Sequence, residues 1–258
     1  MARELSLQEL ITSSFEHQMA GINTCIPGII VSVDDLDSLS VSVQPTVNMK
    51  FKDGQVQEYP TITNVPLLMP SSSTSAVTFP VNAGDPVLII FSMRGVDNFK
   101  AGNGRPAAPT DFRKFDLSDA FAIPAPWPKS KSINNPSKHV WDHSAKDMVM
   151  VHNLGGGSEC EFRLKADGSI QIRTNQDVEV LGKSVTVNAT EEINLNSPAM
   201  TVDIDNTTWI GAINLQGNLV QVGNYTMTGI ATFNGIVFNT HRHLGVTTGS
   251  GTSGGPTT

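Results

Sequence analysis

The sequence predicts an all-β protein with two consecutive β regions behind one short helix. Residues 26–125 alternate short apolar runs with turn residues, and residues 170–222 repeat pairs of apolar residues at positions i and i+2. Four prolines interrupt residues 124–141, where a regular strand ladder cannot continue. These three observations place a domain boundary between the two β regions, and only the N-terminal segment shows helical periodicity.

The N-terminal segment, residues 1–22, is predicted to contain an amphipathic helix. Apolar residues recur with a period close to 3.6 between Leu7 and Met19. Ser6 and Glu9 stand in capping-box positions just ahead of this stripe. We therefore expect one helix that ends near Gly21.

Residues 23–126 are expected to form the first β domain. Short apolar runs lie at 29–33, 39–43, 65–69 and 87–91, the last of them after a turn at 82–86. About five strands in roughly 100 residues favour a small Greek-key barrel of the OB type, with a β-sandwich as the alternative. Residues 127–148 then form a linker.

Residues 149–238 are expected to form a second β region made of very short strands. The apolar pairs are Ile170/Ile172, Val178/Val180, Val185/Val187, Ile193/Leu195, Val202/Ile204, Ile213/Leu215 and Val220/Val222. Such strands bury too few side chains to offset a backbone entropy cost of roughly 1–2 kcal/mol per residue. Neighbouring strands must come from a solenoid or from three chains wound around one axis, and the irregular spacing favours three chains.

The distal part of this region is free of charge. Residues 206–240 contain no Asp, Glu, Lys or Arg, although charged residues make up 16% of the chain. Such a segment can meet a lipid interior without the cost of burying charges. A tightly packed β-fibre without room for charges explains the same composition, and one object can satisfy both explanations.

Charge and cysteine content exclude several classes of protein. A net charge of −7 gives no basic stripe for a phosphate backbone, so nucleic acid is not expected as a partner. The acidic residues near the N-terminus do not fit a signal peptide, which favours synthesis in the cytoplasm. Cys25 and Cys160 lie far apart and are expected to be free thiols.

A candidate metal site follows the last apolar strand, expected at 233–238. His241 and His243 would point to one face of an extended chain. Two imidazoles make a poor site, but three chains around an axis would present six, which suits an octahedral divalent transition metal. A run of Gly, Ser and Thr follows from Gly245 to Pro256 and by composition resembles a flexible tail.

Other candidate sites are weaker. His139 and His143 could bind a metal ion if they lay on a helix, which Pro136 makes doubtful. The acidic residues at 34–37 and 203–205 could act on a sugar only if two carboxylates met across a cleft, and polar turns explain them more simply. We therefore expect no enzyme and no catalytic residue.

Several motifs resemble the central spike proteins of contractile phage tails, closest to the gp138 type. They are the opening Pro27-Gly28-Ile29-Ile30-x-Ser32-Val33, the stretch from Leu164 to Ile172, and His-x-His followed by a Gly/Ser/Thr run to Gly254-Gly255-Pro256. The resemblance covers nearly the whole chain. It implies an N-terminal OB-fold barrel followed by an intertwined trimeric, triple-stranded β-helix, with a metal-bound apex at residues 239–258.

The resemblance also implies function and partners. Members of this family are homotrimeric virion proteins at the tail tip, which dock on the tail hub through the N-terminal region and pierce the host outer membrane. One iron ion per trimer, Fe²⁺ held by six histidines, would occupy the apex, with another divalent transition metal as the alternative. Two alternative hypotheses are a spike of a pyocin-like or secretion system and a β-helical tailspike enzyme that degrades polysaccharide.

Overall fold

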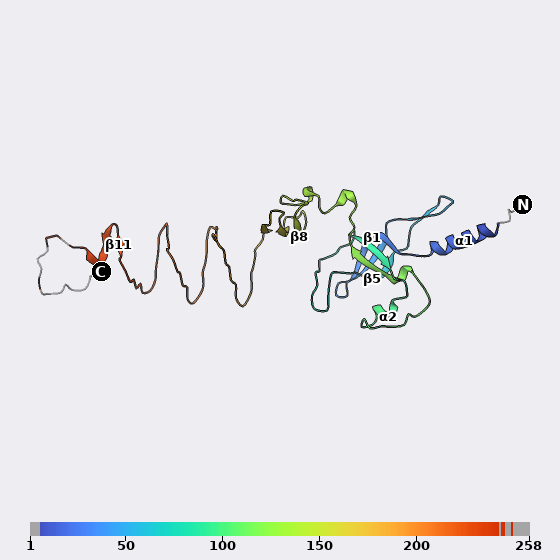
Figure 1. Ribbon diagram of the computed structural model, residues 1–258, viewed down its shortest axis with the longest axis horizontal. Coiled ribbons are helices and arrows are strands. Elements are labelled where there is room, and N and C mark those ends of the chain that lie inside the picture. The colour runs from blue at the N-terminus through green and yellow to red at the C-terminus, as the bar shows by residue number, and fades with distance from the viewer. Residues whose placement is uncertain (1–5, 243, 246–248, 250–258) are drawn as a thin grey trace. The chain divides into compact units, whose positions relative to one another are not determined.

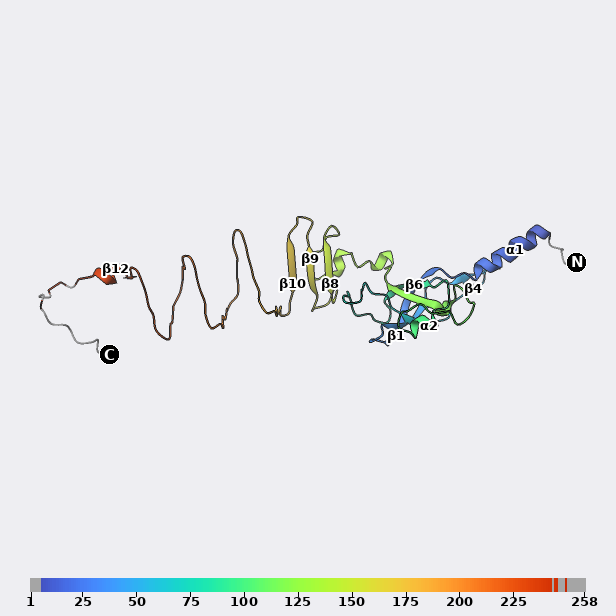
Figure 2. The ribbon, with the colours of Figure 1, turned by 60° about the horizontal axis from the view of Figure 1, so that its bottom comes forward.

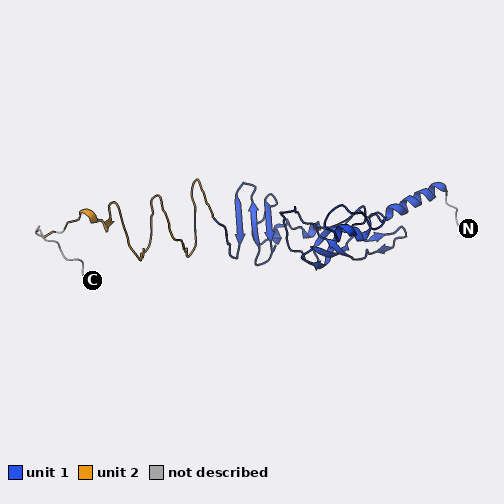
Figure 3. Ribbon diagram, turned by 90° about the horizontal axis from the view of Figure 1, so that it is seen from below, with its two compact units in different colours: residues 1–183 blue, residues 184–258 orange. Residues whose placement is uncertain are grey.

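The computed structural model describes residues 6–242, 244, 245 and 249. The chain divides into two units, residues 1–183 and residues 184–258, which are coloured separately in Figure 3. No helix among the described residues has both the length and the apolar character needed to cross a membrane.

Helix α1 (Leu7–Ala20) begins and ends where the sequence predicts. The Ser6 hydroxyl accepts a hydrogen bond from the Glu9 backbone N–H at 3.3 Å, and the Glu9 carboxylate accepts one from the Ser6 backbone N–H at 2.8 Å. This reciprocal pair is the predicted capping box. Gly21 is the C-cap, and no residue of the helix is buried.

A curled five-stranded sheet forms the first β domain and confirms the all-β prediction. Its strands are β1 (Cys25–Asp35), β2 (Ser40–Pro45), β5 (Ile62–Pro66), β6 (Pro86–Phe91) and β7 (Ala120–Pro124). Their order in the sheet is β5-β2-β1-β6-β7, with every neighbouring pair antiparallel. Figure 1 shows β1 and β5 within this domain.

The edges of this sheet meet through a parallel contact. Leu67 and Ala122 form a β-bridge, and the Leu68 N–H donates to the Ala122 carbonyl at 2.7 Å. The sheet thereby closes around one apolar core. The buried core residues are Ile30, Val41, Val43, Ile62, Val65, Leu67, Val81, Val87, Ile89, Phe91, Ala120 and Ala122.

Two details of the barrel differ from the expectation. The strand expected at 65–69 runs instead over Ile62–Pro66, because Leu67 and Leu68 have already turned to meet β7. A small hairpin of β3 (Met49–Lys50) and β4 (Val56–Gln57) was not predicted. Short helical turns connect the remaining elements: α2 (Asp97–Lys100), η1 (Leu117–Asp119), η2 (Lys129–Lys131) and η3 (Pro136–Lys138).

A second, three-stranded antiparallel sheet follows the linker. It consists of β8 (Met148–His152), β9 (Cys160–Leu164) and β10 (Ile170–Thr174), in the order β10-β9-β8 (Figure 2). The apolar pair predicted at Ile170 and Ile172 lies on β10.

The two faces of this sheet have an unusual polarity. One face is charged and buried. It carries Glu159, just before β9, and Glu161 and Arg163 at alternate positions of β9, with at most 3% of each residue exposed. The opposite face is apolar, and its residues are between 36% and 66% exposed. It consists of two cross-strand rows, Met150–Phe162–Ile172 and Met148–Leu164–Ile170.

Beyond β10 the single chain lacks the predicted short strands. Residues 175–231 contain no strand, and none of the residues described from 175 to 242 is buried. Figure 3 shows the orange unit, which begins at residue 184, as successive extended passes of one chain. A strand without a partner has no ladder to pair with, so the triple-stranded β-helix stays a prediction for several chains together.

Glycines punctuate this segment at an interval of six residues. They are Gly211, Gly217, Gly223, Gly229 and Gly235, and each has a positive φ, between 81° and 136°. Residues that carry a side chain rarely adopt these backbone angles, whereas glycine does so readily. The backbone therefore changes direction at the same point of each six-residue repeat.

A hairpin replaces the single strand expected at 233–238. Strands β11 (Thr232–Phe233) and β12 (Ile236–Val237) pair across Asn234 and Gly235, whose φ angles are 49° and 81°. Two consecutive positive φ angles at Asn-Gly are the signature of a two-residue type I′ hairpin turn. The turn η4 (Phe238–Thr240) follows directly.

Candidate metal sites

The distal hairpin places His241, the first of the two predicted apex ligands. The Phe238 N–H donates to the Ala231 carbonyl at 2.7 Å, and the rings of Phe233 and Phe238 pack edge to face at 6.1 Å. His241 is the C-cap residue of η4 and is exposed. His243, the second predicted ligand, lies outside the described residues.

The hydrogen bonding of His241 suits a metal ligand. Its Nδ1 lies 2.7 Å from the Phe238 carbonyl oxygen, which can only accept, so Nδ1 carries the proton. Nε2 is then the ring atom that carries a lone pair. Metal-ligating histidines commonly donate their other ring N–H to a backbone carbonyl in this way.

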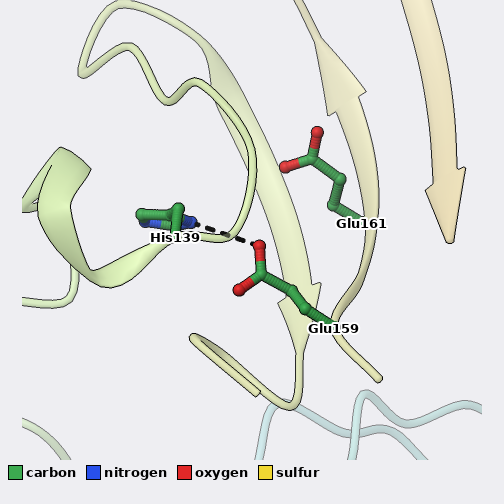
Figure 4. Close-up of side chains that lie close together, drawn as sticks. All are labelled: His139, Glu159 and Glu161. Atoms are coloured by element: carbon green, nitrogen blue, oxygen red, sulfur yellow. Dashed lines mark ion pairs between the residues drawn. The ribbon is translucent and has the colours of Figure 1, made fainter. Parts of the chain in front are cut away.

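A second group of potential ligands lies between the linker and the three-stranded sheet. His139 follows η3, and Glu159 and Glu161 belong to the charged face of β9. One ligand atom from each of the three lies within 4.8 Å of the others. Figure 4 shows the ring and both carboxylates converging, with a dashed line between His139 and Glu159.

The tautomers of two histidines are set by their neighbours. His139 Nε2 lies 3.0 Å from the Ile133 carbonyl oxygen, and His143 Nε2 lies 2.6 Å from Asn134 Oδ1. Both Nε2 atoms therefore donate, which leaves a lone pair on each Nδ1 of a neutral ring. Both Nδ1 atoms are buried without a hydrogen-bond partner in the described part of the chain.

The histidine rings support each other. They stack with centroids 3.8 Å apart and an interplanar angle of 2°. Burial, together with the nearby His139 and Arg163, lowers the pKa of His143 below its usual value. His143 is therefore neutral at neutral pH, and its ring covers one face of His139.

The charges around this group do not balance. Arg163 is almost fully buried and pairs with Glu161 at 3.1 Å, and Arg173 pairs with Asp142 at 2.7 Å. Glu159 accepts hydrogen bonds from the backbone N–H groups of Val140 and Gly155. Asp142 is 82% exposed, so the buried carboxylates are those of Glu159, Glu161 and Asp147. These three carboxylates outnumber the two guanidinium groups of Arg163 and Arg173 that lie beside them.

Sequence reasoning found part of this second group. It named His139 and His143 and doubted a helix, and the structure places Pro136 in a short 3-10 turn rather than a helix. It missed Glu159 and Glu161. Their spacing of two residues, beside apolar residues that alternate with them, could have indicated the site, because residues at i and i+2 share one face of a strand.

Two of the acidic residues considered as catalytic groups, Asp34 and Asp35, lie at the end of β1, next to the turn that leads to β2. Asp34 accepts hydrogen bonds from Ser32 and Ser42, and Asp35 accepts one from Ser38. Burial opposes ionisation of Asp34, but these hydrogen bonds outweigh it, so its pKa is lowered. The general acid of a glycosidase needs a raised pKa, so neither residue has the expected environment.

Comparison with known protein families gives two matches in separate parts of the chain. Residues 26–125 match the family described as the phage protein Gp138 N-terminal domain, and residues 235–257 match the GpV apex motif. The first match spans the five-stranded sheet, and the second begins at the turn of the distal hairpin and includes both predicted apex histidines. The apex motif is metal-binding in spikes. No curated protein matches the chain.

Proposed function

We propose that three copies of the chain form the cell-puncturing spike of a contractile tail. The two family matches support this proposal, because they indicate a phage baseplate spike protein of the gp138/gpV type. Sheath contraction would drive this spike through the host outer membrane. The chain would be made in the host cytoplasm and assembled into the baseplate at the tail tip.

The observation that carries the trimer is the uncovered apolar face of the three-stranded sheet. Its two rows contain six large apolar side chains, and the charged face of the same sheet is the one covered by the chain's own linker. A soluble chain rarely leaves such a face to water. Three copies placed around an axis would bury all three apolar faces against one another.

The distal segment supports the same arrangement. Its apolar side chains recur in extended backbone, yet Ile210 and Val222 are each 97% exposed. The six-residue glycine spacing places changes of backbone direction at regular intervals, between which short strands would form once copies pair. Three copies in register could therefore supply one another with ladder partners and bury these side chains together.

The N-terminal barrel is proposed to be an OB-fold that docks on the tail hub. The sheet order is β5-β2-β1-β6-β7, and a parallel bridge closes it between Leu67, directly after β5, and Ala122 of β7. This is the connectivity of a five-stranded OB barrel. Helix α1 lies next to it in sequence and exposes Leu7, Ile11 and Phe15. We place the hub contact on this N-terminal region.

The apex is proposed to bind one iron ion per trimer through His241 and His243 of each copy. Six neutral imidazoles around a threefold axis suit an octahedral divalent transition metal, of which Fe²⁺ is our choice. The bond from His241 to the Phe238 carbonyl would hold each ring for this purpose. The ion would fasten the three ends together, and the interwoven strands would resist bending, because separation breaks many ladder bonds at once.

Two other functions remain as alternatives. A pyocin-like or secretion-system spike would use the same fold and the same mechanical action. A tailspike enzyme would need converging carboxylates, and residues 206–240 contain none. We propose a structural role without catalysis.

Native mass spectrometry of the full-length chain tests the proposal. We expect three chains and one tightly held transition-metal ion at the apex, in addition to any metal bound elsewhere. In His241→Ala/His243→Ala we expect the trimer to persist and the iron to be lost, because the apolar faces rather than the ion hold the chains together. A monomeric wild-type chain would refute the spike, and iron retained by the double variant would refute the apex ligands.

A further inference from the structure

We propose that His139, Glu159 and Glu161 bind a divalent transition-metal ion that fastens the linker to the charged face of the three-stranded sheet. This site would be present once in every chain. It involves neither apex histidine and does not depend on trimer formation.

The tautomer of His139 is the first argument. Its Nε2–H is used by the Ile133 carbonyl, so the Nδ1 of a neutral ring directs a lone pair toward Glu159 Oε1, 3.9 Å away. A lone pair facing a carboxylate is repelled unless Nδ1 takes up a proton or a metal cation lies between the two atoms. The backbone carbonyl therefore plays the orienting role that such groups play for metal-bound histidines.

Burial is the second argument. The side chains of His139, Glu159 and Glu161 are 2%, 0% and 0% exposed, so water cannot satisfy them. His139 Nδ1 and Glu161 Oε1 have no hydrogen-bond partner among the described residues. Buried polar atoms without partners are uncommon, and two that face the same point indicate a missing ligand.

Charge is the third argument. The buried carboxylates outnumber the guanidinium groups of Arg163 and Arg173, so a bound cation would offset the remaining negative charge. Buried charges are tolerated when they are paired or when they coordinate a metal. Arg163 Nη2 pairs with Glu161 Oε2 at 3.1 Å, and Arg173 Nη1 lies 3.7 Å from Oε1, beyond hydrogen-bond distance. Oε1 therefore feels a guanidinium charge but accepts no hydrogen bond from the described residues.

The chemistry of the ligands selects the class of ion. Imidazole nitrogen and carboxylate oxygen are both ligand types that zinc accepts, and three protein ligands with a water would complete a four-coordinate shell. Metal–ligand distances of about 2.0–2.2 Å require the three atoms to close slightly from their present separation. Cys160 alternates with the two glutamates along the chain and so points to the other face, which excludes it from the shell.

Zinc stoichiometry of the full-length chain provides the test. The His241→Ala/His243→Ala variant is loaded with Zn²⁺, dialysed and analysed by inductively coupled plasma mass spectrometry, so that the apex cannot contribute. We expect one zinc per chain. Adding His139→Gln should reduce the stoichiometry to near zero, whereas His152→Gln, an exposed histidine of β8, should leave it at one.

Each outcome decides the proposal. A zinc-free starting variant would show that a protonated His139 rather than a metal balances the cluster, and unchanged zinc in His139→Gln would place the ion elsewhere; either result overturns the site. If His139→Gln fails to fold, X-ray absorption at the zinc edge of the starting variant replaces it. A shell of one imidazole with oxygen ligands supports the site, and a sulfur-containing or all-imidazole shell refutes it. Trimer formation is measured separately, so failure here leaves the spike proposal intact.

Discussion

The barrel and the distal segment use the same kinds of residue in opposite ways. In the barrel, strands of five to eleven residues pair within one chain and bury twelve apolar side chains in a common core. From residue 175 to 242 the same β-forming residues are present, but none of them is buried. Apolar alternation therefore predicts a strand and its buried face, while the source of the covering surface depends on how many strands one chain can bring together.

The three-stranded sheet stands between these two extremes. Its ladder is complete within one chain, yet its apolar face is uncovered and its charged face is buried by the linker. The first chain-to-chain contact of the proposed trimer is therefore expected at this sheet. Substitutions on its apolar face test whether the chain needs neighbouring copies beyond the barrel.

The largest effect is expected from Phe162→Asp. Phe162 lies in the middle of the apolar row with Met150 and Ile172, and burying a carboxylate there would cost several kcal/mol in each chain. We expect the trimer to dissociate while the barrel remains folded, as measured by native mass spectrometry and circular dichroism. Phe112→Asp is the matched control, because Phe112 is 97% exposed in a barrel loop and should leave the trimer unchanged. Intact Phe162→Asp trimers would show that this face is not the interface.

A smaller effect is expected from the double variant Gly217→Ala/Gly223→Ala. A side chain at these φ angles, 136° and 117°, costs about 1–3 kcal/mol per position, and a trimer contains six such positions. We expect the thermal dissociation of the distal fibre to move to lower temperature without change in the unfolding of the barrel.

Gly84→Ala provides the reverse control for the glycine variants. Gly84 has a φ of 93° in the turn before β6, so its substitution should destabilise the barrel and leave the fibre unchanged. Differential scanning calorimetry should resolve the two transitions. If both substitutions move both transitions together, the two regions unfold as one unit and the comparison fails.

These regions also differ in how far the sequence could predict them. The helix limits and the capping box depend on local contacts between Ser6 and Glu9 and were predicted correctly. The turn at Asn234–Gly235 was missed, although Asn-Gly is a strong hairpin signal, because the flanking apolar run was taken as one strand. The six-residue glycine spacing was likewise present in the sequence and was overlooked in favour of the apolar pairs.

The candidate sites show a different limit of prediction. His241 and His243 were found because the motif is local, but their proposed site needs two further copies of the chain. The second group brings His139 together with residues 20 and 22 positions later, and no local motif contains that distance. Its assembly depends on the linker covering the charged face of β9, which only the folded chain shows.

The smallest effect is expected within the barrel, from Asp119→Asn. Asp119 is fully buried and accepts hydrogen bonds from Arg113 Nε at 2.8 Å, Arg113 Nη2 at 2.9 Å and the Val96 N–H at 2.9 Å. Loss of charge-assisted bonds of this kind costs about 1.5–3 kcal/mol. We expect the barrel of Asp119→Asn to melt several degrees lower at pH 7, whereas Asp111→Asn, which removes a half-exposed partner of the same arginine, should change little.

The pH dependence of this variant distinguishes a contact within the barrel from a contact between chains. Hydrogen bonds from Arg113 outweigh the opposing effect of burial and lower the pKa of Asp119 below the value of about 3.9 expected in the unfolded chain. The unfolded state therefore binds more protons just below that pH, so the stabilisation is complete above it and is lost as the pH falls through the folded pKa. The melting difference between wild type and Asp119→Asn should accordingly shrink below about pH 4 and be independent of protein concentration. A difference that varies with concentration would mean that the barrel, like the distal segment, depends on neighbouring chains for its stability.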